Sequence, residues 1–96
     1  MQPFDEAFAQ VRIEETYDKD ANLVKRVENG RKFLISLGCR IRNCRLSRGW
    51  TQEDLSERAG LSAKYIGEVE RGEKNPTYLV LVQIADAIGI KPREFF

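Results

Sequence analysis

The sequence contains no histidine, two cysteines, three prolines and seven glycines among its 96 residues. Without histidine the chain lacks the usual general base and the commonest metal ligand, so most hydrolytic and metal-assisted chemistries lose their most frequent residue. The longest apolar run, residues 79–82, is far shorter than the roughly 20 residues of a membrane-spanning helix. No basic segment followed by an apolar one opens the chain. We therefore expect a cytoplasmic protein that is not an enzyme and has no metal, no cofactor and no membrane contact.

The composition is that of a globular chain, with 42% hydrophobic and 32% charged residues. This length allows one compact domain with a short extension. Cys39 and Cys44 are five positions apart within a predicted helix, which separates their Cα atoms by about 8 Å, beyond the reach of a disulfide. We expect two reduced thiols.

The charge of the chain is nearly balanced, with a formal net charge of +1, so overall basicity does not indicate a nucleic-acid partner. The distribution of charge is less even. A segment of nine residues contains four arginines and no acidic residue, and these arginines are Arg40, Arg42, Arg45 and Arg48. Such a run is most often a solvated helix face, so phosphate binding by these arginines requires support from neighbouring motifs.

Residues 36–96 contain repeated signals for the starts and ends of helices. Thr51 followed by Asp54 resembles a capping box, and Ser62 and Thr77 are typical N-cap residues. Glycines follow the helix-like segments and are suited to ending them. The pattern predicts five short helices: 36–48, 52–59, 63–71, 78–88 and a terminal turn that begins at Pro92.

Residues 1–35 give weaker signals and two readings compete. Alternating apolar residues in 11–17, a polar loop and the apolar segment 23–27 favour a β-hairpin, and Asn29-Gly30 is a further turn signal. A helix over 4–11 is the alternative, because its apolar residues also share one helical face. We favour the hairpin as an N-terminal extension, and an isolated hairpin needs to pack on the helices or on a second subunit.

Three stretches of the helical region carry a family pattern: LGCRIR at 37–42, GWTQEDLS at 49–56 and GLSAKYIGEVERG at 60–72, followed by Asn75-Pro-Thr. Together they resemble the helix-turn-helix domain of the lambda-repressor and Cro type, the XRE family of bacterial and phage regulators. The resemblance implies a mainly α, five-helix DNA-binding domain over residues 36–96. It does not cover the extension 1–35.

The same resemblance makes residues 62–71 a recognition helix that lies in the major groove with its first residues against base edges. Helical geometry agrees, because Ile66 and Val69 on an inner face leave the remaining positions pointing outward. One departure is Gly67, where the family commonly has serine and where glycine costs about 1 kcal/mol against alanine. The alternative for these positions is ordinary solvated residues. The expected base contacts are Ser62, Ala63, Lys64, Gly67 and Glu68.

Phosphate contacts are expected around the recognition helix. Gln52 is the first residue of the preceding helix, where its amide and the free backbone N–H groups suit a phosphate. The weaker candidates are Arg42, Tyr65, Lys74 and Asn75. The resemblance also pairs Arg45 with Glu70 in an ion pair that fixes the recognition helix rather than contacting bases.

Several functions share this scaffold. We expect a repressor or autoregulator that binds an inverted-repeat operator as a homodimer, because two recognition helices related by a two-fold axis read two half-sites. Phage-like repressors and controller proteins of restriction-modification systems both resemble the stretch 65–72. The alternative is an antitoxin in which residues 1–35 bind a protein partner. The dimer contact is expected at Ile88, Ile90, Phe95 and Phe96, unless these side chains simply close the core.

Overall fold

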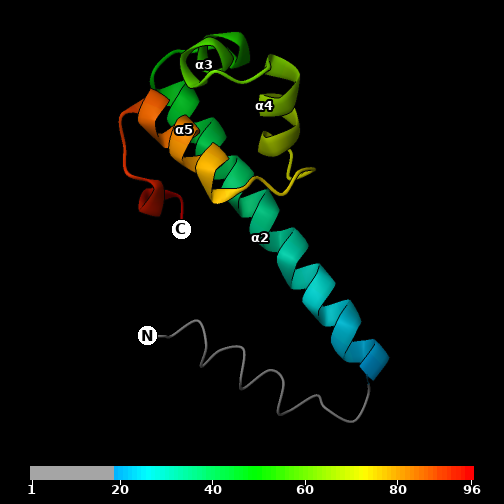
Figure 1. Cartoon of the computed structure of the whole chain (residues 1–96). Coiled ribbons are helices and arrows are strands. Elements are labelled where there is room, and N and C mark those ends of the chain that lie inside the picture. Colours follow the sequence, from blue (N-terminus) through cyan, green and yellow to red (C-terminus); the bar gives the residue numbers. More distant parts are fainter. Residues whose placement is uncertain (1–18) are drawn as a thin grey trace. The chain divides into compact units, whose positions relative to one another are not determined.

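The computed structural model describes the backbone of residues 19–96 and the side chains of residues 25–96. This part of the chain contains four α-helices, one 3-10 helix and no strand (Figure 1). None of these helices is both long and apolar enough to cross a membrane. The elements are α2 (Lys19–Ser47), α3 (Gln52–Ala59), α4 (Ala63–Glu70), α5 (Tyr78–Ile88) and η1 (Pro92–Phe95).

The predicted β-hairpin is wrong where the structure tests it. Residues 23–27, expected as its second strand, lie within α2, and Asn29-Gly30 is helical rather than a turn. Two physical reasons favour the helix here. Lysine, arginine and glutamate in this segment have higher helix than strand propensity. Extending a helix that is already formed also costs far less than nucleating one. The first strand expected at 11–17 and the alternative helix at 4–11 lie outside the described residues.

The predicted count of five short helices is also wrong. The last segment forms a single 3-10 turn, η1, rather than an α-helix. Pro92 starts this turn, and Lys91 donates its backbone N–H to a carboxylate oxygen of Glu94 at 3.3 Å. Four residues suit the tighter 3-10 geometry, which proteins use in short pieces. The first helix is far longer than expected, because α2 begins at Lys19 and runs through the boundary predicted between residues 35 and 36.

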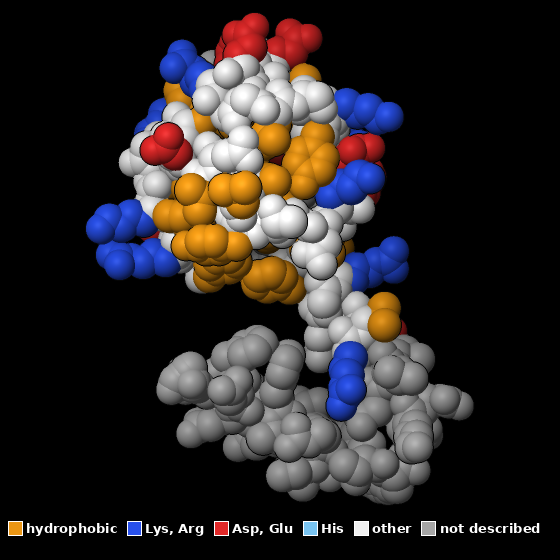
Figure 2. Space-filling view, in the orientation of Figure 1, with side chains coloured by type: hydrophobic (Ala, Val, Ile, Leu, Met, Phe, Trp, Pro, Cys, Tyr) orange, Lys and Arg blue, Asp and Glu red, His pale blue; other side chains and the backbone are white. Residues whose placement is uncertain are grey.

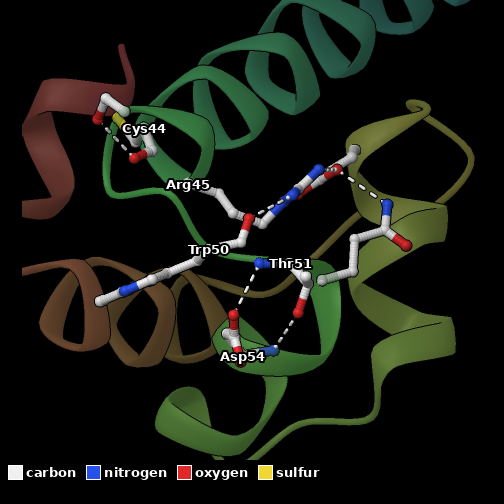
Figure 3. Close-up of polar contacts among 8 residues, drawn as sticks. Cys44, Arg45, Trp50, Thr51 and Asp54 are labelled. Atoms are coloured by element: carbon white, nitrogen blue, oxygen red, sulfur yellow. Dashed lines mark hydrogen bonds and ion pairs between the residues drawn. The ribbon is translucent and has the colours of Figure 1, made fainter.

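The start signals of the short helices are confirmed. The Thr51 hydroxyl accepts a hydrogen bond from the Asp54 N–H at 3.0 Å, and the Asp54 carboxylate accepts one from the Thr51 N–H at 2.9 Å (Figure 3). These hydrogen bonds to Thr51 hold the pKa of Asp54 below its ordinary value. Ser62 and Thr77 cap α4 and α5 in the same way through their hydroxyls. Local sequence therefore determines where α3, α4 and α5 begin.

Residues 31–96 form one compact unit of the chain. Helix α3 packs against both α4 and α5, and α5 packs against η1. The part of α2 in this unit contributes Leu37 and Ile41 to the same core. The core thus joins α2 to the three shorter helices, and its fully buried large side chains are Phe95, Ile41, Leu55, Ile66, Ile84 and Val69.

Helices α2 and α4 approach each other closely at Gly38. A Cβ atom built on Gly38 would lie 2.4 Å from the backbone oxygens of both Val69 and Glu70. No real Cβ atom tolerates such a separation, so only glycine fits at this point of α2. The close approach fixes the end of α4 against α2.

Candidate functional site

Helices α3 and α4 form a helix-turn-helix unit. Helix α3 ends at Gly60, which adopts the left-handed conformation with φ of 72°, and α4 begins after the cap at Ser62. Ile66 and Val69 of α4 are buried in the core. The opposite side of α4 is therefore the side available to a partner.

The expected base-contacting residues differ in how much of them a partner can reach. Ser62 and Lys64 are exposed, while Ala63 and Glu68 are half-buried. These four residues occupy the cap and the outer side of α4. Gly67 is different, because it is buried.

Gly67 lies beneath two long side chains. A Cβ atom built there would lie 3.2 Å from Nη1 of Arg71 and 3.2 Å from Oε1 of Gln52. Gly67 therefore leaves space in which the ends of these side chains lie. Sequence reasoning recognised the glycine as a departure from the family but did not connect it with Arg71.

Gln52, expected at a phosphate, is half-buried at the start of α3. Its Nε2 donates a hydrogen bond to Oε1 of Glu70 at 3.0 Å. This bond links the first residue of α3 to the last residue of α4. The remaining phosphate candidates Arg42, Lys74 and Asn75 are exposed, and Tyr65 is half-buried against the core.

Arg45 and Glu70 form a buried, two-pronged ion pair. Nε of Arg45 donates to one carboxylate oxygen of Glu70 at 2.7 Å and Nη2 donates to the other at 3.0 Å. Nη1 donates to the Trp50 carbonyl at 2.8 Å, and Figure 3 shows the Arg45 side chain pointing from α2 toward this carbonyl. The hydrogen bond to Glu70 raises the pKa of Arg45. These contacts tie α2, the start of α3 and the end of α4 together.

Two more arginines of the acid-free run act within the fold. Arg48 donates from Nε and Nη2 to the Ile88 carbonyl at the end of α5. Arg40 donates to the Phe96 carbonyl at 3.3 Å. Of the four arginines in the run, only Arg42 makes no hydrogen bond or ion pair within the described residues. Arg40, Arg45 and Arg48 thus each have a partner that lies 25 or more positions away along the chain.

A second arginine–glutamate pair lies on the surface at the end of α4. Nε and Nη2 of Arg71 donate to the two carboxylate oxygens of Glu73 at 2.9 and 3.2 Å. The hydrogen bond from Arg71 lowers the pKa of Glu73. Sequence reasoning missed this pair, although an arginine at the end of the recognition helix with a glutamate two residues later was a visible signal.

The residues expected at a dimer contact divide between core and surface. Ile88 and Phe95 are only 3% and 1% exposed and belong to the core, and Ile90 is half-buried. Phe96 is 54% exposed and stacks on the ring of Phe33, with 5.8 Å between the ring centroids. Figure 2 shows hydrophobic side chains gathered on one face of this unit, where α5 and η1 lie in Figure 1.

The described residues offer no metal site, since none of their histidine, cysteine, aspartate or glutamate side chains form a group of three or more suited to hold an ion. Both cysteines are free thiols, with Cys39 exposed and Cys44 half-buried.

Comparisons with known proteins agree with this architecture. A family model described as helix-turn-helix matches residues 41–95. An uncharacterised HTH-type transcriptional regulator, y4dJ of Sinorhizobium fredii, is 37% identical over 54 residues, which cover 56% of this chain and 70% of that protein. The immunity repressor protein of Bacillus phage phi105 is 39% identical over 57 residues, covering 59% of this chain and 40% of the repressor.

A solved structure is similar over nearly its whole length. The restriction-modification controller protein C.AhdI from Aeromonas hydrophila shares 40% sequence identity, with a TM-score of 0.65, and the match covers 66% of this chain and 96% of the controller protein. The matched helix-turn-helix pattern, the relatives and the arrangement of α3 and α4 lead to one assignment. The chain belongs to the XRE-type helix-turn-helix family of DNA-binding transcriptional regulators.

Proposed function

We propose that the chain is a repressor or autoregulator that binds an inverted-repeat operator as a homodimer, with residues 62–71 in the major groove. The observation that carries this proposal is the exposed outer side of α4, whose N-terminal turn offers Ser62 and Lys64 while its inner side is buried. A phage immunity repressor and a restriction-modification controller protein among the similar proteins support regulation of this kind.

Lys64 is the main base-reading residue in this proposal. Its ammonium group is exposed on the first turn of α4, and lysine donates to O6 and N7 of guanine. Ala63 suits a thymine methyl group, and Glu68 accepts from cytosine N4. Gln52, Arg42, Tyr65, Lys74 and Asn75 are assigned to phosphates, which fix the register without reading sequence.

The proposal is tested by selection from a random duplex library at about 150 mM salt, where non-specific phosphate binding is suppressed. We expect a two-fold symmetric motif with half-sites about 34 Å apart. Lys64→Ala should cost about 1 to 3 kcal/mol of binding free energy and relax one position of each half-site. Lys91→Ala is the matched control, because it removes the same charge from an exposed position outside the helix-turn-helix. Enrichment of no sequence would reject operator binding.

The proposed homodimer contact is the apolar surface around Phe96. Its members on the described part of the chain include the stacked rings of Phe33 and Phe96, and Phe96 is one of the residues expected at the contact. A second copy of this chain is the proposed occupant, because an inverted repeat requires two recognition helices. Phe33→Asp combined with Phe96→Asp should reduce the molar mass measured by light scattering to that of one chain. An unchanged dimer mass would move the contact elsewhere.

A further inference from the structure

Arg71 ends the recognition helix and its guanidinium lies next to the groups assigned to DNA. Its backbone N–H donates to the Gly67 carbonyl at 3.1 Å, which continues the last turn of α4. Its Nη1 lies close to Gly67, 3.2 Å from the position that a Cβ atom on this glycine would take. The Gln52 amide lies over the same glycine at the same distance. The ends of the Arg71 and Gln52 side chains therefore both lie beside Gly67, although Gln52 starts α3 and Arg71 follows the end of α4.

Glu73 occupies the same edge of this guanidinium that a phosphate would use. The carboxylate accepts from Nε and Nη2 at 2.9 and 3.2 Å, which is the two-pronged geometry of an arginine fork. A phosphate group is recognised by the same fork, with the same spacing of donors. One anion can therefore replace the other without a new arrangement of Arg71.

The exposure of the pair makes this exchange inexpensive. The side chains of Arg71 and Glu73 are 59% and 54% exposed. An ion pair of this kind in water contributes little to stability, and holding it costs side-chain entropy. The pair therefore adds little to the stability of the fold, in contrast to the buried pair of Arg45 and Glu70.

We propose that Glu73 holds Arg71 in the DNA-free chain and that a DNA phosphate displaces Glu73, which makes Arg71 an additional DNA contact and Glu73 a built-in competitor. This inference rests on the proposed DNA binding. The competing carboxylate lowers affinity for every DNA sequence alike, because phosphates carry no sequence information. The ratio of the affinity for the operator to the affinity for non-specific DNA is then set by the base contacts of α4 rather than by Arg71.

Gly67 leaves room for the Arg71 side chain in this arrangement. A side chain at this position would occupy the space beside Nη1 of Arg71 and the Gln52 amide. The departure from serine at position 67 therefore matches the position of the guanidinium. A chain with serine at this position would direct Arg71 differently, and the contact with Glu73 would have to adjust.

The test compares Glu73→Gln with Glu57→Gln, which removes the same charge from an exposed position of α3. Binding of the selected operator and of a random duplex is measured by fluorescence anisotropy from about 0.15 to 1 M salt. Glu73→Gln should steepen the slope of log binding constant against log salt concentration by about 0.9. Over this range of salt such a change in slope corresponds to binding that is about fivefold tighter at the lowest salt. Glu57→Gln should change the slope by much less.

A double-mutant cycle with Arg71→Gln then assigns the gain to the arginine. Arg71→Gln should weaken both DNAs and should abolish the gain from Glu73→Gln. An equal gain in Glu57→Gln, or a gain that persists without Arg71, would overturn the inference while leaving operator binding intact. If neither the unmodified chain nor any of the variants binds DNA, the proposed function fails as well. Melting temperatures of all four variants well above the temperature of the binding assay exclude unfolding as the cause.

Discussion

Two arginine–glutamate pairs flank the last turn of α4 with nearly the same fork geometry and opposite surroundings. The side chains of Arg45 and Glu70 are 8% and 2% exposed, whereas those of Arg71 and Glu73 are 59% and 54% exposed. In the buried pair every contact also joins separate elements, since Glu70 accepts from Gln52 as well. In the exposed pair the two partners are only two positions apart along the chain. The buried pair of Arg45 and Glu70 therefore stabilises the fold, whereas the exposed pair of Arg71 and Glu73 remains available to a partner.

The largest test of this difference is to remove one acid from each pair. Glu70→Ala leaves Arg45 buried without its carboxylate and should lower the free energy of unfolding by about 3 to 5 kcal/mol. Glu73→Ala leaves Arg71 in water and should shift the urea unfolding midpoint only slightly, far less than Glu70→Ala does. Equal losses in the two variants would contradict the division between a structural and an available pair.

The second test concerns the backbone on the buried side of α4. Gly38→Ala would place a Cβ atom 2.4 Å from the Val69 and Glu70 oxygens, and we expect a loss of about 1 to 3 kcal/mol from overpacking. Gly30→Ala, also within α2, meets nothing within 4 Å and should gain about 0.5 to 1 kcal/mol from helix propensity. Thermal unfolding of both variants measures the contrast. A gain in Gly38→Ala would mean that α2 and α4 lie farther apart.

The third test is the glycine on the open side. At Gly67 the nearest atoms to a built Cβ are the ends of the Arg71 and Gln52 side chains rather than backbone. These ends can shift, so the gain in helix propensity, about 1 kcal/mol at most, should balance the displacement. We expect the free energy of unfolding of Gly67→Ala to lie within about 1 kcal/mol of that of the unmodified chain. A loss as large as that of Gly38→Ala would show that Gln52 is held rigidly by Glu70.

Sequence reasoning succeeded where structure depends on neighbouring residues and failed where it depends on distant ones. The capping pair Thr51 and Asp54 and the caps Ser62 and Thr77 were readable because each acts within three positions. The family pattern supplied the helix-turn-helix. It could not supply the partners of Arg40 and Arg48, which are carbonyl groups 56 and 40 positions away.

The errors at the N-terminal side have a related cause. The apolar segment 23–27 was expected as the second strand of a hairpin, but Leu23 and Val27 are four positions apart, which also fits a helix. Continuity with the core-packed part of α2 decides between them, and a short window does not contain that information. At Gly67 the helical period gives the outward direction but not its neighbours, because the ends of two long side chains from other positions lie beside it; the base contact expected there stays a prediction.

The smallest expected effect is the dependence of the exposed pair on pH. The hydrogen bond from Arg71 lowers the pKa of Glu73 in the folded chain below its ordinary value of 4.5, and the unfolded chain keeps that ordinary value. The stability that the pair contributes is therefore present above pH 4.5 and is lost as pH falls through the lowered pKa. The difference in unfolding free energy between the unmodified chain and Glu73→Gln should thus be largest near neutral pH and vanish in acid. All other carboxylates titrate in both proteins and cancel in this difference. A difference that grows in acid would mean that Glu73 is not the acceptor of Arg71 in solution, and the competition between Glu73 and DNA phosphate would lose its basis.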